Sequence, residues 1–128
     1  MPIVWEALEN DGTGVVSDWN LPVKVAAKLE QKLDMLRSAE IDAAGRPVLP
    51  HGMFAGPVHG QKSIYKVLVN GELALRPMIG KSADGEWIVL ARCVKKGNDT
   101  GAEEIAAVTA GSRLAEIATG ARARKELT

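Results

Sequence analysis

The chain has 128 residues, 46% of them hydrophobic and 25% charged, and its 16 basic residues balance its 16 acidic ones. This length provides one hydrophobic core of modest size and excludes two separate domains. We therefore expect a single domain over residues 1–128. The zero net charge argues against a protein devoted to binding a polyanion, because such proteins ordinarily carry an excess of Lys and Arg.

Cysteine content and hydropathy narrow the class further. With Cys93 as its one cysteine, the chain forms neither an internal disulfide nor a cysteine zinc site. Its first residues lack the basic and apolar runs of a secretory signal, and no apolar run reaches the length that a membrane span needs. These features predict a cytoplasmic protein with no membrane partner, in which Cys93 is a small, buried apolar residue.

Two regular elements and a long connection are predicted in the first 60 residues. Residues 3–8 are mostly apolar and end at the turn-forming residues 10–14, a pattern that predicts a strand. Residues 43–60 are rich in Gly, Pro and His, so an irregular connection is expected there. Between them, four apolar residues recur at helical spacing and predict an amphipathic helix. They are Val25, Leu29, Leu33 and Leu36.

Residues 63–94 predict an antiparallel meander of three strands. The first two strands flank Asn70 and Gly71, a dipeptide that strongly favours a two-residue hairpin turn. A second turn follows at residues 82–85 and leads into the third strand at residues 86–94.

The last third of the chain is predicted to be helical. Thr100 and Glu103 stand three residues apart and match a capping box at the start of this helix. The polar residues 119–128 are expected to form a frayed tail. The order strand, helix, connection, meander, helix indicates the α+β class. The apolar positions of the final helix are Ile105, Val108, Leu114 and Ile117.

The neutral total hides an uneven distribution of charge. Residues 62–96 contain seven basic and three acidic residues, a net charge of +4, whereas residues 1–61 carry −3 and residues 97–128 carry −1. Strand alternation places Lys66 and Arg76 opposite their apolar neighbours, so both are expected to point to solvent from one face. Such a face could bind a phosphate backbone or could be an ordinary solvated surface. The seven cations are Lys62, Lys66, Arg76, Lys81, Arg92, Lys95 and Lys96.

Three short segments, followed by a helix rich in Ala and Glu, carry a family resemblance. They are residues 63–67 (Ser-Ile-Tyr-Lys-Val), 75–77 (Leu-Arg-Pro) and 94–97 (Val-Lys-Lys-Gly). In order and spacing, the chain from residue 15 to 118 resembles the RelE/ParE toxin superfamily, and within it the HigB-like, phage-related branch. The resemblance implies a small RelE-like domain in which a curved antiparallel sheet, made of the N-terminal strand and the three-stranded meander, packs against helices.

The resemblance also implies a function. RelE and HigB members are toxins of type II toxin–antitoxin systems that cut mRNA on the ribosome, use no metal or small-molecule cofactor, and are bound by a cognate antitoxin, here expected to be of the helix-turn-helix type. A ribose 2′-OH attacks the adjacent phosphate, so the enzyme must move protons and stabilise charge on the phosphoryl oxygens. By position, the catalytic residues would be Lys66, Arg76 and Lys96. The residues that bind RNA would be Lys62, Lys81, Arg92 and Lys95.

The sequence leaves other functions open. Active members of the family place a Tyr or His near the final helix, but neither residue type occurs after Trp87. The alternative is therefore a catalytically inactive RelE-fold binding protein or a ParE-like toxin that acts on a protein target. A more distant alternative is a tautomerase that uses the secondary amine of an N-terminal Pro2 as its base.

The two histidines of the long connection are the remaining candidates for chemistry. His51 and His59 stand eight residues apart, a spacing that does not favour a zinc site, so no metal site is expected. His59 closely precedes the meander and is a candidate general base.

Overall fold

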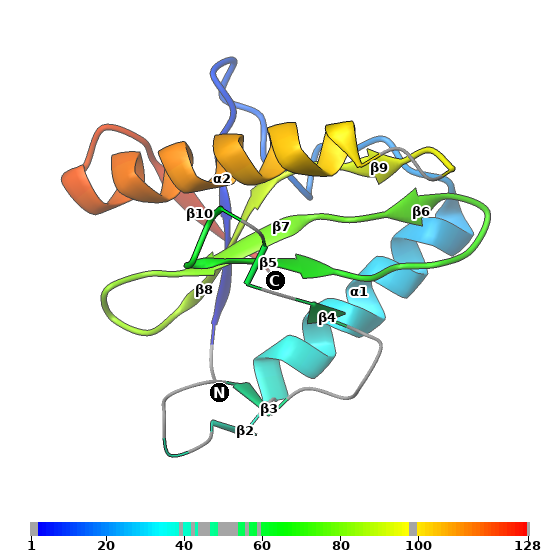
Figure 1. The fold of residues 1–128 in the computed structure, drawn as a ribbon, viewed down its shortest axis with the longest axis horizontal. Coiled ribbons are helices and arrows are strands. Elements are labelled where there is room, and N and C mark those ends of the chain that lie inside the picture. The colour runs from blue at the N-terminus through cyan, green and yellow to red at the C-terminus, as the bar shows by residue number, and fades with distance from the viewer. Residues whose placement is uncertain are drawn as a thin grey trace.

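A six-stranded sheet with a long helix on either side forms the body of the protein (Figure 1). In Figure 1, α2 (Gly101–Thr119) and α1 (Val23–Ser38) lie on opposite sides of strands β5 (Ile64–Val67) and β7 (Met78–Lys81). This arrangement confirms the α+β class expected from the sequence. The computed structural model describes residues 3–38, 40–41, 43, 47–48, 54–55, 57–58, 60–97 and 100–127.

The sheet is mixed, which corrects the purely antiparallel sheet expected from the sequence. The other strands in the described part of the chain are β1 (Val4–Ala7), β2 (Glu40–Ile41), β3 (Pro47–Val48), β4 (Phe54–Ala55), β6 (Ala74–Leu75), β8 (Trp87–Ala91), β9 (Val94–Lys95) and β10 (Arg124–Leu127). The large sheet has the order β10–β1–β8–β7–β5–β4, and its neighbours are antiparallel except for β1 and β8. That parallel pair requires a crossover connection, which α1 begins after β1. Two small pairs, β2 with β3 and β6 with β9, complete the strands.

The first half of the chain folds largely as its apolar pattern predicts. β1 lies within the strand expected at residues 3–8. Within residues 43–60, expected to be irregular, the structure places the two-residue strands β3 and β4. Helix α1 buries all four residues of its predicted apolar stripe, because their spacing puts them on one helix face. These residues are Val25, Leu29, Leu33 and Leu36.

The meander forms as β5, β7 and β8, but its first turn is wider than predicted and its second strand, expected as one element, is divided into β6 and β7. β7 and β8 are joined through the turn at residues 82–85, where Gly85 has a positive φ of 85°. Val69 and Leu75 exchange two backbone hydrogen bonds of 3.1 and 2.9 Å, so the first loop spans residues 70–74. The prediction of a two-residue turn at Asn70 and Gly71 is therefore wrong. Leu75, which closes this loop, belongs to β6, and β6 pairs with β9 outside the large sheet.

Helix α2 buries a different face from the one that its sequence predicts. Ile105 and Val108, expected in the core, are 71% and 58% exposed. A Cβ atom on Gly80 of β7 would lie 3.1 Å from the Leu114 side chain, so the helix approaches the sheet closely and small side chains fit best between them. In the described part of the chain, neither α2 nor α1 is long and apolar enough to cross a membrane. The residues that α2 buries on the sheet include Ala106, Ala107 and Ala110.

The C-terminal tail, expected to be frayed, instead forms β10 at the edge of the sheet. Its pairing with β1 places Leu127 opposite Val4, and the Arg124 guanidinium lies 4.3 Å from the centre of the Trp5 ring. The reason is tertiary: β1 would otherwise present an unpaired edge, and β10 covers that edge.

Replacing Leu127 with alanine is expected to lower the free energy of unfolding by about 2 kcal/mol, because the loss of this buried side chain leaves a cavity beneath β10. Lys125→Ala, at an exposed position of the same strand, is the matched control and should change that free energy by less than about 0.5 kcal/mol. Urea denaturation measures both variants. Equal effects would show that the burial of Leu127 in β10 contributes nothing to stability.

Candidate functional site

Three cations converge on one glutamate of α2, and we call these four residues the Glu103 cluster. Lys66 Nζ lies 2.7 Å from Glu103 Oε2, while Arg76 Nε and Lys95 Nζ lie 4.0 and 3.9 Å from Glu103 Oε1. The Glu103 side chain is 7% exposed, that of Arg76 11% and that of Lys66 26%. The cluster therefore joins a buried carboxylate to one largely buried cation and two half-buried ones, with a net charge of +2.

Neighbouring strands and the first turn of α2 bring the cluster together. Lys66 lies on β5, Arg76 directly follows β6, and Lys95 lies on β9, the partner of β6. The structure thus brings Lys66 and Arg76 close together, as expected, but both meet α2 where solvent exposure was expected. That expectation is wrong because helices cover both faces of the sheet, so a polar residue opposite the apolar set still lies under a helix.

Glu103 is the cluster residue whose role the sequence does not reveal. Its spacing from Thr100 matches a capping box, but the Thr100 side chain makes no capping hydrogen bond, and the Glu103 carboxylate turns to the three cations. On the helix, Glu103 shares a face with Ala107 and Ala110, four and seven residues later. A charged residue on a buried face requires a partner of opposite charge. The pairing of Glu103 could therefore be predicted only after the buried face of α2 is known.

Arg76 is held in place by the loop that precedes it. Its guanidinium donates hydrogen bonds to the Leu75 carbonyl oxygen at 2.7 Å and to Asn70 Oδ1 at 2.8 Å. Its backbone N–H donates to the Cys93 carbonyl oxygen at 2.7 Å. These bonds fix the guanidinium beside Glu103 before any ligand binds. A cation positioned in advance can stabilise developing negative charge without reorganising.

The two carboxylate oxygens of Glu103 differ in their hydrogen bonding. Oε2 accepts a hydrogen bond from Lys66 Nζ, whereas Oε1 is buried and has no hydrogen-bond partner among the described residues. Leaving a buried acceptor unsatisfied is unfavourable, so a hydroxyl that reached Oε1 would gain a hydrogen bond there. The cluster can therefore accept a proton from a bound hydroxyl while its cations stabilise an adjacent anion.

Cys93 adjoins the cluster but is not an activated nucleophile. It is buried, as the sequence predicts. Burial raises the pKa of its thiol and the Glu103 carboxylate raises it further, while Arg76 and Lys66 oppose that shift. A thiol with a raised pKa holds less of the reactive thiolate at neutral pH, so Cys93 acts as a packing residue.

The other predicted site cations do not join the cluster. Lys96 is exposed beyond β9, and its neighbour Lys95 is the lysine that reaches Glu103. Lys62 is exposed before β5, and Lys81 at the end of β7 lies 5.7 Å from the centre of the Trp87 ring. Both line hollows beside α2.

Arg92, a predicted RNA-binding residue, holds the loop that follows β1. Its Nε atom donates to the Val15 carbonyl oxygen at 2.7 Å, and Nη2 donates to the Gly14 carbonyl oxygen at 3.0 Å. The guanidinium also lies 3.4 Å from a Glu9 carboxylate oxygen and 5.9 Å from the centre of the Trp19 ring. Because its donors are engaged within the protein, Arg92 stabilises the fold.

A groove of about 710 Å³ opens beside the cluster. Lys66 and Glu103 line it, so this groove borders the cluster from the solvent side. It lies between the first half of α2 and the segment before β5. The other residues that line it are Pro57, Val58, Gly60, Gln61, Thr100, Glu104, Ala107 and Val108.

Two sequence predictions lie outside the described residues: His59 as a general base, and Pro2 as the base of a tautomerase. Within the part of the chain that is described, no group of three or more His, Cys, Asp or Glu side chains is arranged to hold a metal ion.

Comparisons with protein-family models, with curated proteins and with solved structures give no match to this chain. The site is therefore interpreted from its own geometry.

Proposed function

We propose that this chain is the toxin of a type II toxin–antitoxin system, similar to the HigB-like branch of the RelE/ParE superfamily, and that it cuts mRNA on the ribosome. The observation that carries the proposal is the convergence of Lys66, Arg76 and Lys95 on the buried carboxylate of Glu103. Two of these cations, Lys66 and Arg76, are the ones that the family resemblance assigns to catalysis. The order strand, helix, meander, helix also supports the proposal.

In the proposed reaction the RNA supplies its own nucleophile. The Glu103 carboxylate accepts the proton of a ribose 2′-OH, the 2′-oxygen bonds to the adjacent phosphorus, and the bond from phosphorus to the 5′-oxygen breaks. The leaving 5′-oxygen takes a proton from water. The products end in a 2′,3′-cyclic phosphate and a 5′-hydroxyl.

The cations perform the electrostatic part of this reaction. Arg76 and Lys66 lie next to the Glu103 carboxylate, so they can stabilise the negative charge that the phosphoryl oxygens gain in the transition state. Positioned donors of this kind contribute roughly 100- to 1000-fold each to the rate. Because three cations supply the positive charge, the reaction requires neither a metal ion nor a small-molecule cofactor.

The proposed function includes a partner. An enzyme that cuts mRNA must be restrained in the cell that makes it, so we propose a cognate antitoxin of the helix-turn-helix type. Coexpression with the reading frame next to the gene tests this partner: a stable complex that suppresses growth inhibition supports it.

A specific observation favours a second function, that of a RelE-fold binding protein without catalysis. All three cations of the cluster already pair with Glu103, and Arg76 is also bonded to its own loop. In this second function the cluster serves to fasten α2 to the sheet. A ParE-like toxin that acts on a protein target would share this feature.

An assay in a translating extract separates these functions. Purified protein is added to a defined mRNA, and primer extension maps new 5′ ends with and without ribosomes. New ends that appear only during translation are expected of the toxin. Growth inhibition with intact mRNA would contradict the proposal and favour the ParE-like alternative.

A further inference from the structure

A continuous groove runs along one side of α2, and we call it the α2 groove. It consists of three hollows, of about 710 Å³ at the first half of the helix, 320 Å³ at its middle and 560 Å³ at its end. Adjacent hollows share lining residues: Gly60 and Gln61 line the first two, while Leu114 and Ala118 line the last two. From Glu103 to Ala118 the helix spans about 22 Å, which sets the length of the groove.

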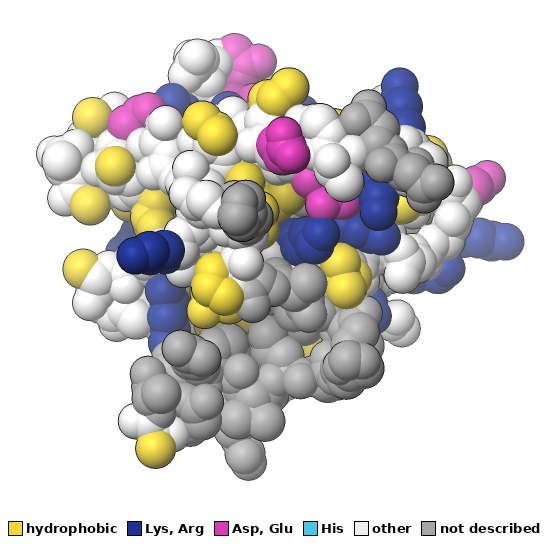
Figure 2. Space-filling model, in the orientation of Figure 1, with side chains coloured by type: hydrophobic (Ala, Val, Ile, Leu, Met, Phe, Trp, Pro, Cys, Tyr) yellow, Lys and Arg dark blue, Asp and Glu magenta, His cyan; other side chains and the backbone are white. Residues whose placement is uncertain are grey.

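The two walls of the α2 groove differ in chemistry. The helix wall is apolar or small in the second and third hollows, and in the first it also carries Glu103 and Glu104. Each hollow has at least one cation on the opposite wall: Lys66 in the first, Lys62 in the second and Lys81 in the third. Figure 2 shows Lys and Arg side chains along the border of α2 that faces the rest of the sheet. The apolar and small residues of the helix wall are Ala107, Val108, Gly111, Leu114, Ala115, Ile117 and Ala118.

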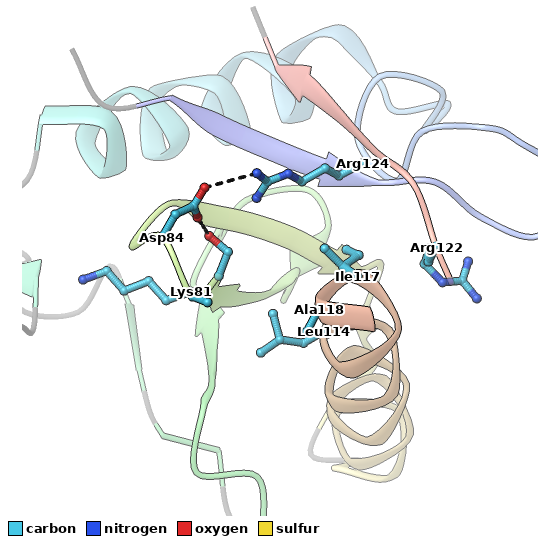
Figure 3. A pocket seen from close by; sticks show the side chains of 9 residues that line it. Lys81, Asp84, Leu114, Ile117, Ala118, Arg122 and Arg124 are labelled. Atoms are coloured by element: carbon cyan, nitrogen blue, oxygen red, sulfur yellow. Dashed lines mark hydrogen bonds and ion pairs between the residues drawn. The ribbon is translucent and has the colours of Figure 1, made fainter. Parts of the chain in front are cut away.

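The end of the α2 groove lies between the helix and the β7–β8 turn (Figure 3). Leu114, Ile117 and Ala118 project from α2, and the Arg124 guanidinium reaches from β10 to Asp84 at 3.3 Å. Arg122, which also lines this hollow, pairs with Glu116 at 2.8 Å. The cations outnumber the acidic residues in this hollow, because Asp84 is the one acidic lining residue described there. This end therefore attracts a negatively charged chain.

We infer that the α2 groove binds a single strand of RNA, with its phosphates on the basic wall and its bases against the apolar wall. This inference rests on the proposed function, because it leads the strand to Lys66 and Glu103. A length of about 22 Å accommodates roughly four nucleotides of an extended strand. Unpaired bases are required, since a base within a duplex cannot reach an apolar wall. The neutral total charge does not oppose such binding, because five basic residues line the α2 groove against three acidic ones in the described part of the chain.

Binding of a 2′-O-methyl RNA hexanucleotide, measured by fluorescence anisotropy, tests the inference without cleavage, because the 2′-oxygen cannot attack. Lys62→Glu reverses a charge in the middle hollow, and Ala118→Trp fills the groove from an exposed helix position. Each is expected to weaken binding roughly tenfold, and Lys62→Glu should also reduce the dependence of log K on log salt by about 0.7 for the lost phosphate contact. Affinity should increase with strand length up to roughly four nucleotides and then level off.

Two matched controls keep the test specific. Lys24→Glu makes the same charge change at an exposed position of α1, and Ser112→Trp makes a similar size change at an exposed position of α2 that does not line the three hollows. Both should bind the hexanucleotide within about twofold of the wild type. Equal binding of the hexanucleotide by all four variants would overturn the proposal that the α2 groove binds RNA.

The groove and the cleavage activity can fail separately. Hexanucleotide binding that is weakened by Lys62→Glu and Ala118→Trp, together with intact mRNA in the translating extract, would support the groove and contradict the nuclease. Cleavage that is lost in Lys66→Ala but normal in both groove variants, with normal hexanucleotide binding, would support the nuclease and overturn the groove. If the protein binds a peptide but does not bind the hexanucleotide, the proposal that the α2 groove binds RNA is likewise overturned.

Discussion

Replacing Glu103 with alanine should lower the free energy of unfolding by about 3 kcal/mol, because this carboxylate is the common partner of three cations. Arg76 is largely buried and would lose its counter-charge, while Lys66 and Lys95 can still reach water. For that reason the expected loss is at the low end of the range for breaking a buried ion pair. Urea denaturation, followed by circular dichroism, measures the change.

The neighbouring residue provides a control for the Glu103 variant. Glu104 follows it in the same helical turn but is exposed, so Glu104→Ala should change the free energy of unfolding by less than about 0.5 kcal/mol. Both substitutions remove one acidic residue from the first turn, so their effects on the helix dipole are similar. A Glu103 variant as stable as the Glu104 variant would show that the cluster does not fasten α2 to the sheet.

If the proposed reaction holds, replacing Lys66 with alanine should reduce mRNA cleavage at least about 100-fold, because the variant loses a cation that would stabilise the phosphoryl oxygens. Lys66 is 26% exposed, so its ion pair with Glu103 is partly screened by solvent, and the variant should fold with a loss below about 1.5 kcal/mol. Primer extension in the translating extract measures cleavage, and urea denaturation measures folding.

The comparison that isolates catalysis is with Lys24→Ala, which removes the same charge from the exposed surface of α1. This variant should cut mRNA at the wild-type rate. Lys66→Arg keeps the charge and should restore part of the activity, since the guanidinium can still reach phosphate. A folded Lys66→Ala protein that cuts as fast as Lys24→Ala would remove Lys66 from the proposed catalytic site.

Local patterns predicted the elements whose burial follows from one-dimensional spacing. The stripe of Val25, Leu29, Leu33 and Leu36 is unambiguous, and the structure buries all four residues. Helix α2 offered no such stripe, because its apolar residues surround the helix and alanine suits either environment. Its orientation depends on the space above Gly80, which is a property of the packed sheet. The polar tail became β10 because the edge of β1 accepts a strand, and no local pattern reveals such an edge.

The candidate site shows the same division between local and tertiary information. Alternation along β5 separates Lys66 from Tyr65 and Val67, but it cannot tell whether solvent or a second helix covers the face of Lys66. Glu103 matched a helix cap because its spacing from Thr100 is the only local signal it carries. The partners that define its role, Arg76 and Lys95, lie 27 and 8 residues away in sequence and meet it only in the folded chain.

In the proposed function, RNA is cut through attack by its own 2′-OH at the Glu103 cluster. The most direct test uses the mRNA in which cutting has been mapped, with a single 2′-deoxy nucleotide placed immediately before the cut. Because the deoxy nucleotide lacks the attacking hydroxyl, this one change should abolish cutting at that position, and the unmodified mRNA should give new ends carrying a 5′-hydroxyl. Continued cutting at the deoxy position, or new ends carrying a 5′-phosphate, would contradict it.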